Sequence, residues 1–387
     1  MSKHTRLMAL SLLSFLRVGS LVLALGILFL APAQAQILKP VGEGIYAFVG
    51  ENFTANAGVV ITDDGVVVIE SGSTPAVSKA ILKEIQTLTQ KPLRFIINSQ
   101  SHPDHWVGNY VFSPPALVIG HEKMKGEILA MPPNRLAGIR ATYQDFRTAL
   151  PHITYRDKMA LELGGRQFEL YYLENSHTQG DTAIWLPRER ILFSGSTVYT
   201  TRAPNVRDGS TTGMLKALDF LATLNPKVVI PGHGPLGEAK DIQQMKTYIS
   251  LLRQRVGEEI KKGEKLDEIK TSVKVPEFSH WDRLAQELPA NVESAYFDLT
   301  GLPKPKHEAH EEMRRIAGIV EKNEGGGRSI TVKAASGESV TLSVSQSRTA
   351  ISRAGKPAKR EEIKVGEKID AEYDAAEKNT AATIKIE

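Results

Sequence analysis

The stretch LRFIINSQSHPDHWVGN, residues 93–109, is the most informative part of the chain. Its apolar start, LRFII, predicts a buried strand because it is short and rich in β-branched and aromatic residues. Three ligand-type residues, His102, Asp104 and His105, follow within four positions. A loop directly after a buried strand can direct two imidazoles and a carboxylate into one cavity. The stretch therefore predicts a metal site at the end of a strand.

Two further histidines also follow predicted strands. His177 lies in NSHTQGD at residues 175–181, and His233 lies in VIPGHGP at residues 229–235. The glycines on both sides of His233 allow a sharp turn and a close approach to an ion. The chain contains no cysteine, so a metal would be bound by histidine, carboxylate or amide groups.

Strands and helices alternate from residue 37 onward. Hairpin-joined strands mixed with helices favour an α/β sandwich with helices on both outer faces over a doubly wound parallel sheet. The apolar spacing predicts a helix that starts near Pro75, a long helix over 238–263 and further helical cover over 264–300. The predicted strands are 44–49, 57–62, 66–70, 93–97, 116–119, 168–172, 182–186, 191–194 and 227–230.

Residues 40 to about 240 resemble the metallo-β-lactamase superfamily. Its signature is His-x-His-x-Asp-His after a strand, then a histidine followed by Gly-Asp, a bridging aspartate after a glycine, and Gly-His-Gly at a strand end. The resemblance implies a four-layer αβ/βα sandwich with a zinc site at the edge of the two central sheets. It also implies that Asp181 is the acid beside the third histidine. The matching ligand positions are His102, Asp104, His105, His177 and His233.

Three positions depart from the common pattern. Gln100 stands where most members have the first histidine, and Ser196 stands where most members outside the lactamases have the bridging aspartate. Glu70 replaces the aspartate that usually ends the second strand. The Gln and Ser pair resembles one branch of the third subclass of true metallo-β-lactamases. We expect Ser196, Asp181 and Glu70 to lie next to the ligands rather than on the metal.

The resemblance implies two zinc ions. One would be bound by Gln100, His102 and His177, and the other by the remaining three residues, Asp104, His105 and His233. An amide oxygen is a weaker ligand than an imidazole, so the first ion is expected to be the more weakly bound. Ligation rich in imidazole favours zinc, and the missing bridging carboxylate argues against a di-iron site.

The ions imply hydrolysis of a small-molecule substrate. A zinc-bound water has its pKa lowered to near 7, so a hydroxide is available to attack a carbonyl group, such as that of a β-lactam or a related amide or lactone. Asp104 would orient this hydroxide as well as bind zinc. Two alternatives remain open: a thioesterase or phosphodiesterase on the same fold, and a metal-poor relative that binds without turnover.

Four residues near these motifs are candidates for substrate contact: Trp106, Tyr199, Arg202 and Arg207. An arginine after Ser196 could pair with a substrate carboxylate. A solvated loop charge is the favoured interpretation of these arginines, and a buried packing role is at least as good for Trp106.

Residues 1–35 read as a signal peptide. They contain Lys3 and Arg6, an apolar run over 21–30 and the cleavage signature AQA at 33–35. The run is short for a membrane span, although an uncleaved anchor is the alternative. We expect a secreted, periplasmic chain starting near Gln36 and without a stable membrane anchor.

The chain gives no reason to expect a nucleic-acid partner. Residues 1–35 hold three of the 48 basic residues and none of the 44 acidic ones, so the rest of the chain is nearly neutral.

A change of composition near PKPK at 303–306 predicts a domain boundary. We expect a hydrolase domain over 36–300, a linker with a short charged helix over 301–315, and a small OB-like β-barrel over 316–387. The barrel would serve as an accessory or docking domain whose protein partner is unknown. Its strands are predicted at 329–332, 339–344, 362–365, 368–373 and 382–386. The sequence HEAH at 307–310 is interpreted as part of an exposed linker helix rather than as a second metal site.

Overall fold

The computed structural model describes residues 37–50, 54–143, 145–304, 313–344, 349–354, 356–374 and 380–387. The predicted signal peptide at 1–35 and the HEAH segment at 307–310 lie outside these residues. Within the described part, none of the helices is both long enough and apolar enough to span a membrane.

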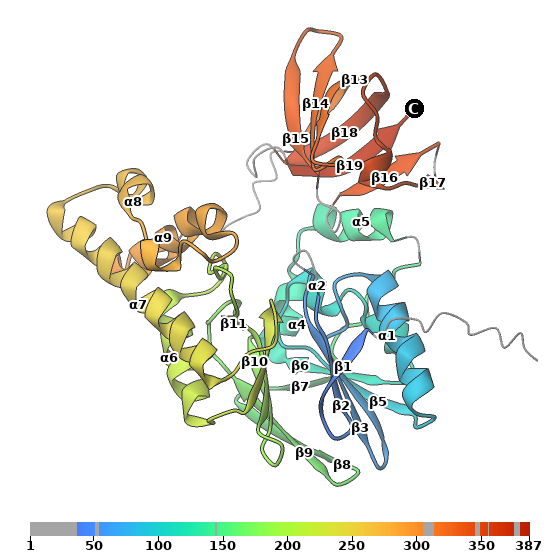
Figure 1. Ribbon diagram of the computed structural model, residues 1–387, viewed down its shortest axis with the longest axis vertical. Helices are drawn as coiled ribbons and strands as arrows, with labels where there is room; N and C mark the ends of the chain where they lie inside the picture. Colours follow the sequence, from blue (N-terminus) through green and yellow to red (C-terminus); the bar gives the residue numbers. More distant parts are fainter. Residues whose placement is uncertain are drawn as a thin grey trace, which may run out of the picture. The chain divides into compact units, whose positions relative to one another are not determined.

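The first sheet contains seven strands in chain order (Figure 1). Its first four strands pair antiparallel, and the later ones pair parallel from β4 to β7. The strands are β1 (Leu38–Gly42), β2 (Ile45–Phe48), β3 (Ala57–Thr62), β4 (Gly65–Ile69), β5 (Leu93–Ile97), β6 (Leu117–His121) and β7 (Ile153–Tyr155). The sequence analysis missed β1, which contains Pro40 and lies at the edge of the sheet, where proline is tolerated.

The second sheet has five strands in the order β12-β11-β10-β9-β8. Only β11 and β12 pair parallel; the other neighbours are antiparallel. The strands are β8 (Lys158–Leu163), β9 (Arg166–Tyr172), β10 (Thr182–Leu186), β11 (Ile191–Tyr199) and β12 (Val228–His233).

Alternation of side chains places the two sheets face to face. In β4, Val67 and Ile69 belong to the core between the sheets, whereas Val66 and Val68 pack toward α1 (Pro75–Leu88). Successive strand residues point to opposite faces, so one apolar run supplies two cores.

The second sheet is covered in the same way. Trp185 in β10 packs toward α6 (Thr211–Thr223) and α7 (Ala239–Lys262), while its neighbour Ile184 faces the first sheet. Figure 1 shows α1 along one sheet and α6 and α7 along the other. This is the four-layer αβ/βα sandwich that the sequence predicts.

The remaining helices complete the edges. The short α2 (Pro103–Trp106) and α3 (Asn109–Phe112) follow β5, and α4 (Glu122–Leu129) and α5 (Pro133–Thr142) follow β6. The predicted cover over 264–300 consists of α8 (Leu266–Ser272), a 3₁₀ turn at Pro276–Phe278 and α9 (Leu284–Thr300). The long helix is confirmed, and it ends at Gly263 in the left-handed conformation with a φ of 85°.

The C-terminal part forms a separate all-β sheet in the order β15-β14-β13-β18-β19-β16-β17. Its strands are β13 (Met313–Glu324), β14 (Ser329–Ala334), β15 (Ser339–Ser343), β16 (Ala350–Arg353), β17 (Lys356–Pro357), β18 (Lys368–Asp374) and β19 (Thr380–Ile386). A single pair, Ser343 with Thr380, joins β15 to β19. Closure of this sheet into a barrel therefore stays a prediction.

Two local predictions for this part were wrong. Residues 313–315 begin the strand β13 instead of ending a charged helix, because they pair with residues 372–374 of β18. Residues 362–365 do not form a strand. The Glu362 carboxylate accepts the Lys359 N–H and closes a 3₁₀ turn, and Val365 is 60% exposed, so only Ile363 is anchored in the core.

Candidate metal centre

The predicted ligands lie at the ends of strands from both sheets. His102, Asp104 and His105 follow β5, with His102 at the start of α2. His177 lies in the loop between β9 and β10, and His233 is the last residue of β12. Residues up to 131 positions apart in the chain thus meet at one edge of the sandwich.

Asp104, His105 and His233 form one half of the centre, which we call the strand half. The Asp104 Oδ2 atom lies 3.7 Å from His105 Nε2 and 3.5 Å from His233 Nε2. One ligand atom from each residue fits within 4.8 Å of the others. Two donors bound at 2.0–2.1 Å to one tetrahedral ion lie about 3.3 Å apart. The strand half therefore has the residues and the spacing of a metal site.

The charges of the strand half suit a cation. Burial opposes ionisation of Asp104, but the neighbouring imidazoles, His105 first, outweigh it and hold the pKa of this carboxyl well below its usual range. Burial lowers the pKa of His233 to about 3. At neutral pH, Asp104 is therefore ionised and His233 is neutral, which are the states that bind metals.

Glu70 supports His105 from behind. One carboxylate oxygen, Oε1, accepts the Ser99 N–H at 3.0 Å and lies 3.4 Å from His105 Nδ1. Burial disfavours the imidazolium, yet the charges of Asp104 and Glu70 outweigh burial and raise the pKa of His105. A carboxylate beside Nδ1 orients the ring and leaves Nε2 directed at the centre.

His102 and His177 form the second half, which we call the loop half. Their facing nitrogens, His102 Nδ1 and His177 Nε2, lie 3.0 Å apart. The opposite nitrogens are engaged: His102 Nε2 donates to Asp208 Oδ2 at 2.9 Å, and His177 Nδ1 donates to the Asn205 carbonyl at 2.6 Å. These acceptors place a hydrogen on each outer nitrogen and turn the other nitrogen of each ring toward the gap.

The facing nitrogens of His102 and His177 suit a metal site, because each can bind a metal when its ring is neutral. Burial, followed by the charge of His102, lowers the pKa of His177 well below its ordinary value, which favours the neutral ring that binds metals. The donor set thus fits a metal ion.

The sequence analysis missed Asp208, although it named the adjacent Arg207. Burial opposes ionisation of Asp208, but the bond to His102 and the charges of His102 and Arg207 hold its pKa well below its usual range. No sequence motif indicates this aspartate, because Asp208 lies 106 residues from His102, which donates the hydrogen bond to it.

Gln100 and Ser196 are buried together. The Gln100 side-chain amide donates to Ser196 Oγ at 2.7 Å, and that oxygen lies 3.4 Å from His105 Nε2. Among the described residues, Gln100 Oε1 is a buried oxygen with no hydrogen-bond partner. Such an oxygen suits a metal ligand, and its assignment to the ion of the loop half stays a prediction.

Asp181 holds the loop that carries His177. Its carboxylate accepts hydrogen bonds from the His177 N–H, from Ser176 Oγ at 2.7 Å, and from the Thr178 N–H and hydroxyl at 2.8 and 2.6 Å. It therefore shapes the loop beside the centre and does not take part in the metal cluster found by geometry.

The four candidates for substrate contact differ in position, and the Arg207 N–H donates to Asn205 Oδ1 at 2.9 Å. Trp106 is buried among apolar residues, and its indole N–H donates to the Ser101 carbonyl at 2.7 Å, which supports the packing alternative. Tyr199 stacks on His233 with ring centres 5.4 Å apart, and the Arg202 guanidinium lies 5.9 Å from the Tyr199 ring.

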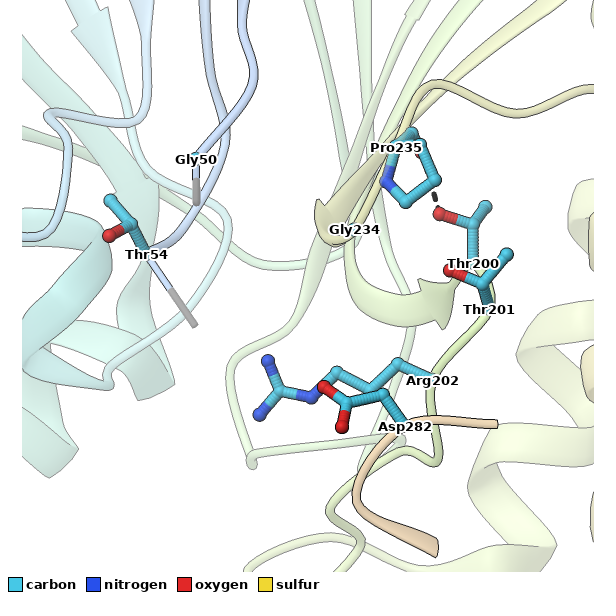
Figure 2. A pocket seen from close by; sticks show the side chains of 8 residues that line it. All are labelled: Gly50, Thr54, Thr200, Thr201, Arg202, Gly234, Pro235 and Asp282. Atoms are coloured by element: carbon cyan, nitrogen blue, oxygen red, sulfur yellow. Dashed lines mark hydrogen bonds between the residues drawn. The ribbon is translucent and has the colours of Figure 1, made fainter. Parts of the chain in front are cut away.

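Arg202 also lines a pocket of about 240 Å³ (Figure 2). Figure 2 shows its guanidinium extending into this space, with Thr54 and Gly50 on the opposite side. Gly234 lines the same pocket and directly follows His233, so the pocket adjoins the strand half.

Residues 50–233 match the family model of the metallo-beta-lactamase superfamily, and this part of the chain belongs to that superfamily. A metallo-beta-lactamase type 2 of Bacteroides fragilis is 30% identical over 106 residues, which cover 26% of this chain and 43% of that protein. A linear primary-alkylsulfatase of Pseudomonas sp. (strain ATCC 19151) is 21% identical over 257 residues, which cover 55% of this chain and 48% of that protein. The chain thus spans about half the length of these relatives.

The solved structure of the sec-alkylsulfatase Pisa1 from Pseudomonas sp. shares the fold. The TM-score is 0.55 at 16% identity, and the match covers 70% of this chain and 51% of that one.

Proposed function

We propose that this protein is a secreted, zinc-dependent hydrolase that acts on a carbonyl group of a small-molecule substrate, a β-lactam or a related amide or lactone. One observation carries the proposal: Asp104, His105 and His233 bring one ligand atom each within 4.8 Å of the others. Imidazole-rich ligation favours zinc over magnesium, calcium or manganese.

Six residues would bind the zinc ions, and one of them, Asp104, would also orient a water molecule. His102 and His177, with Gln100, would hold one ion, and Asp104, His105 and His233 would hold the other. When bound, zinc lowers the pKa of water and polarises carbonyl oxygens. Asp104, which is ionised, can accept a hydrogen bond from a water molecule and thereby orient it toward a substrate.

The pocket beside the strand half offers polar groups to a substrate. Arg202 and Asp282, which carry opposite charges, line it, and Thr54, Thr200 and Thr201 add hydroxyl groups. Burial lowers the pKa of Arg202, but a guanidinium stays charged at neutral pH. A substrate bound here would lie next to Gly234, which directly follows His233.

The experiment uses the exported chain. Metal content is measured after zinc reconstitution, and turnover is compared on nitrocefin, a thioester, a phosphodiester and an alkyl sulfate, the last because of the similarity to alkylsulfatases. We expect two zinc ions per chain and chelator-sensitive turnover of nitrocefin. The His102→Ala variant is the matched control and should lose one ion.

Two results would contradict the proposal. A chain that binds no zinc after reconstitution would remove the metal centre. Turnover of only the thioester, the phosphodiester or the alkyl sulfate would replace the proposed substrate class.

A further inference from the structure

The helix α9 carries a buried polar stripe. Asn291, Ser294 and Asp298 follow one another at spacings of three and four residues, so they share one face of the helix. Asn291 and Ser294 are fully buried, whereas Leu288 and Val292 on another face join the apolar core with α7. Buried polar side chains need partners. Here Asn291 and Asp298 bond to the segment 204–212, between β11 and α6, and Ser294 bonds to Lys304.

Asn291 fixes the first part of this segment. Its amide donates to the Pro204 carbonyl at 2.8 Å, and its side-chain oxygen accepts the Val206 N–H at 3.0 Å. The amide also donates to the Tyr248 hydroxyl at 3.0 Å, which ties the arrangement to α7. The residue between the two contacts is Asn205, whose carbonyl accepts from His177.

Lys304, just beyond α9, fixes the second part. Its ammonium donates to the Gly209 carbonyl at 2.9 Å, to the Val206 carbonyl at 3.3 Å and to Ser294 Oγ at 3.0 Å. These carbonyls flank Asp208 on both sides.

Asp298 closes the segment at the start of α6. Its Oδ2 accepts from Ser210 Oγ at 3.1 Å, from Thr211 Oγ1 at 2.5 Å and from the Thr212 N–H at 3.0 Å. The segment that contacts both histidines of the loop half is therefore held along its length by α9 and Lys304.

We propose that Asn291 and Lys304 are positioning residues for the metal of the loop half. By holding segment 204–210, they keep the Asn205 carbonyl and the Asp208 carboxylate against the outer nitrogens of His177 and His102. Those contacts set which nitrogen of each ring carries the hydrogen and direct the other toward the metal. The inference rests on the metal centre of the proposed function. Because the strand half is supported by Glu70 after β4, the effect is selective for the loop half.

The main test is a zinc titration of the full chain against a chromophoric chelator that resolves two affinities. Lys304→Met should weaken one of the two sites about tenfold and leave the other unchanged, since outer partners of metal-bound histidines affect affinity by about 10–100-fold. Lys304→Arg keeps the charge and donors and should restore the affinity. Asn291→Ala should weaken the same site at least as much.

The matched control is Lys270→Met. Lys270 forms an ion pair with Glu293 on α9, which is not one of the residues that hold segment 204–212, so both zinc affinities should stay at the parent values.

A second readout works on the metal-free chain. Imidazole ¹⁵N NMR should show the hydrogen of His102 on Nε2 and that of His177 on Nδ1 in the parent. In Lys304→Met and Asn291→Ala, both rings should show mixed tautomers, while the folded state is checked by the dispersion of the amide spectrum.

The outcomes separate the two proposals. Parent-like affinities and tautomers in Lys304→Met would overturn this inference while the proposed function stands. Equal weakening of both zinc sites would overturn it too, because the effect would then be general. A parent chain that binds no zinc would overturn the proposed function. The NMR measurement on the metal-free chain would still decide whether Asn291 and Lys304 set which nitrogen of His102 and of His177 carries the hydrogen.

Discussion

The two halves of the centre are held in place by different kinds of contact. In the strand half, His233 ends β12 and His105 lies in α2, against the Glu70 carboxylate that accepts the Ser99 N–H; Glu70 and Ser99 follow the neighbouring strands β4 and β5. In the loop half, His102 and His177 are oriented by a segment whose position depends on α9 and Lys304, 85–98 residues further along the chain. The comparison teaches that one half is supported by regular sheet pairing and the other by long-range side-chain contacts.

The largest expected effect is on the strand half. Asp104→Ala should reduce turnover more than about 100-fold, because it removes a ligand and the ionised acceptor for water, beyond what an outer partner contributes. Steady-state kinetics with zinc in excess measures this. Asp208→Asn is the comparison from the loop half and should retain far more turnover, since its amide oxygen can still accept from His102. Equal losses in the two variants would remove the distinction between the halves.

Acid should destabilise the metal-free chain through His233. Its pKa is about 3 in the folded state and near 6.5 when unfolded, so the unfolded chain takes up the proton first as the pH falls below 6.5. The stability that neutral His233 confers is present above pH 6.5 and is lost progressively between pH 6.5 and 3.

Chelator-treated protein tests this by urea unfolding at pH 7 and pH 4. The parent should lose about 3 kcal/mol more of its free energy of unfolding over this range than His233→Gln, which cannot titrate there. Protonation of His105 has the opposite effect on the free energy of unfolding, because the pKa of His105 is raised in the folded state. Both proteins contain His105, so its effect cancels in the comparison. Identical pH slopes would show that His233 is not held neutral by burial.

The smallest expected effect concerns Gln100. Gln100→Ala should lower the zinc affinity of the loop half about tenfold, because an amide oxygen is lost. Gln100→His should raise this affinity, because imidazole is the better donor. Ser196→Ala is the control, since it removes the amide's acceptor and keeps the Gln100 oxygen. Zinc titration decides, and two parent-like affinities in Gln100→Ala would exclude Gln100 as a ligand.

Most of the sandwich and most of the centre could be predicted because their signals are local. The histidines and Asp104 lie within or shortly after the apolar strands β5, β9 and β12, and the ends of these strands bring them to one edge of the sandwich. The long stripe of Ile242, Met245, Ile249 and Leu252 likewise predicts α7 from helical spacing alone.

Two of the mispredicted segments had weak or misleading local signals. β13 begins in a charged segment whose strand conformation is stabilised by pairing with β18. Residues 362–365 alternate like a strand, but only Ile363 reaches the core. In both places, tertiary contacts outweigh local preference.

By itself, the sequence determined most strands of the two central sheets, the layers around them, and the histidines and aspartate that follow the strands. Periodic apolar residues encode these features over short distances, where neighbouring residues alone decide burial. Only the tertiary structure decided which nitrogen of each histidine faces the centre. That choice depends on hydrogen-bond acceptors such as Asp208 and the Asn205 carbonyl, which the fold brings from far along the chain and which carry no spacing rule of their own.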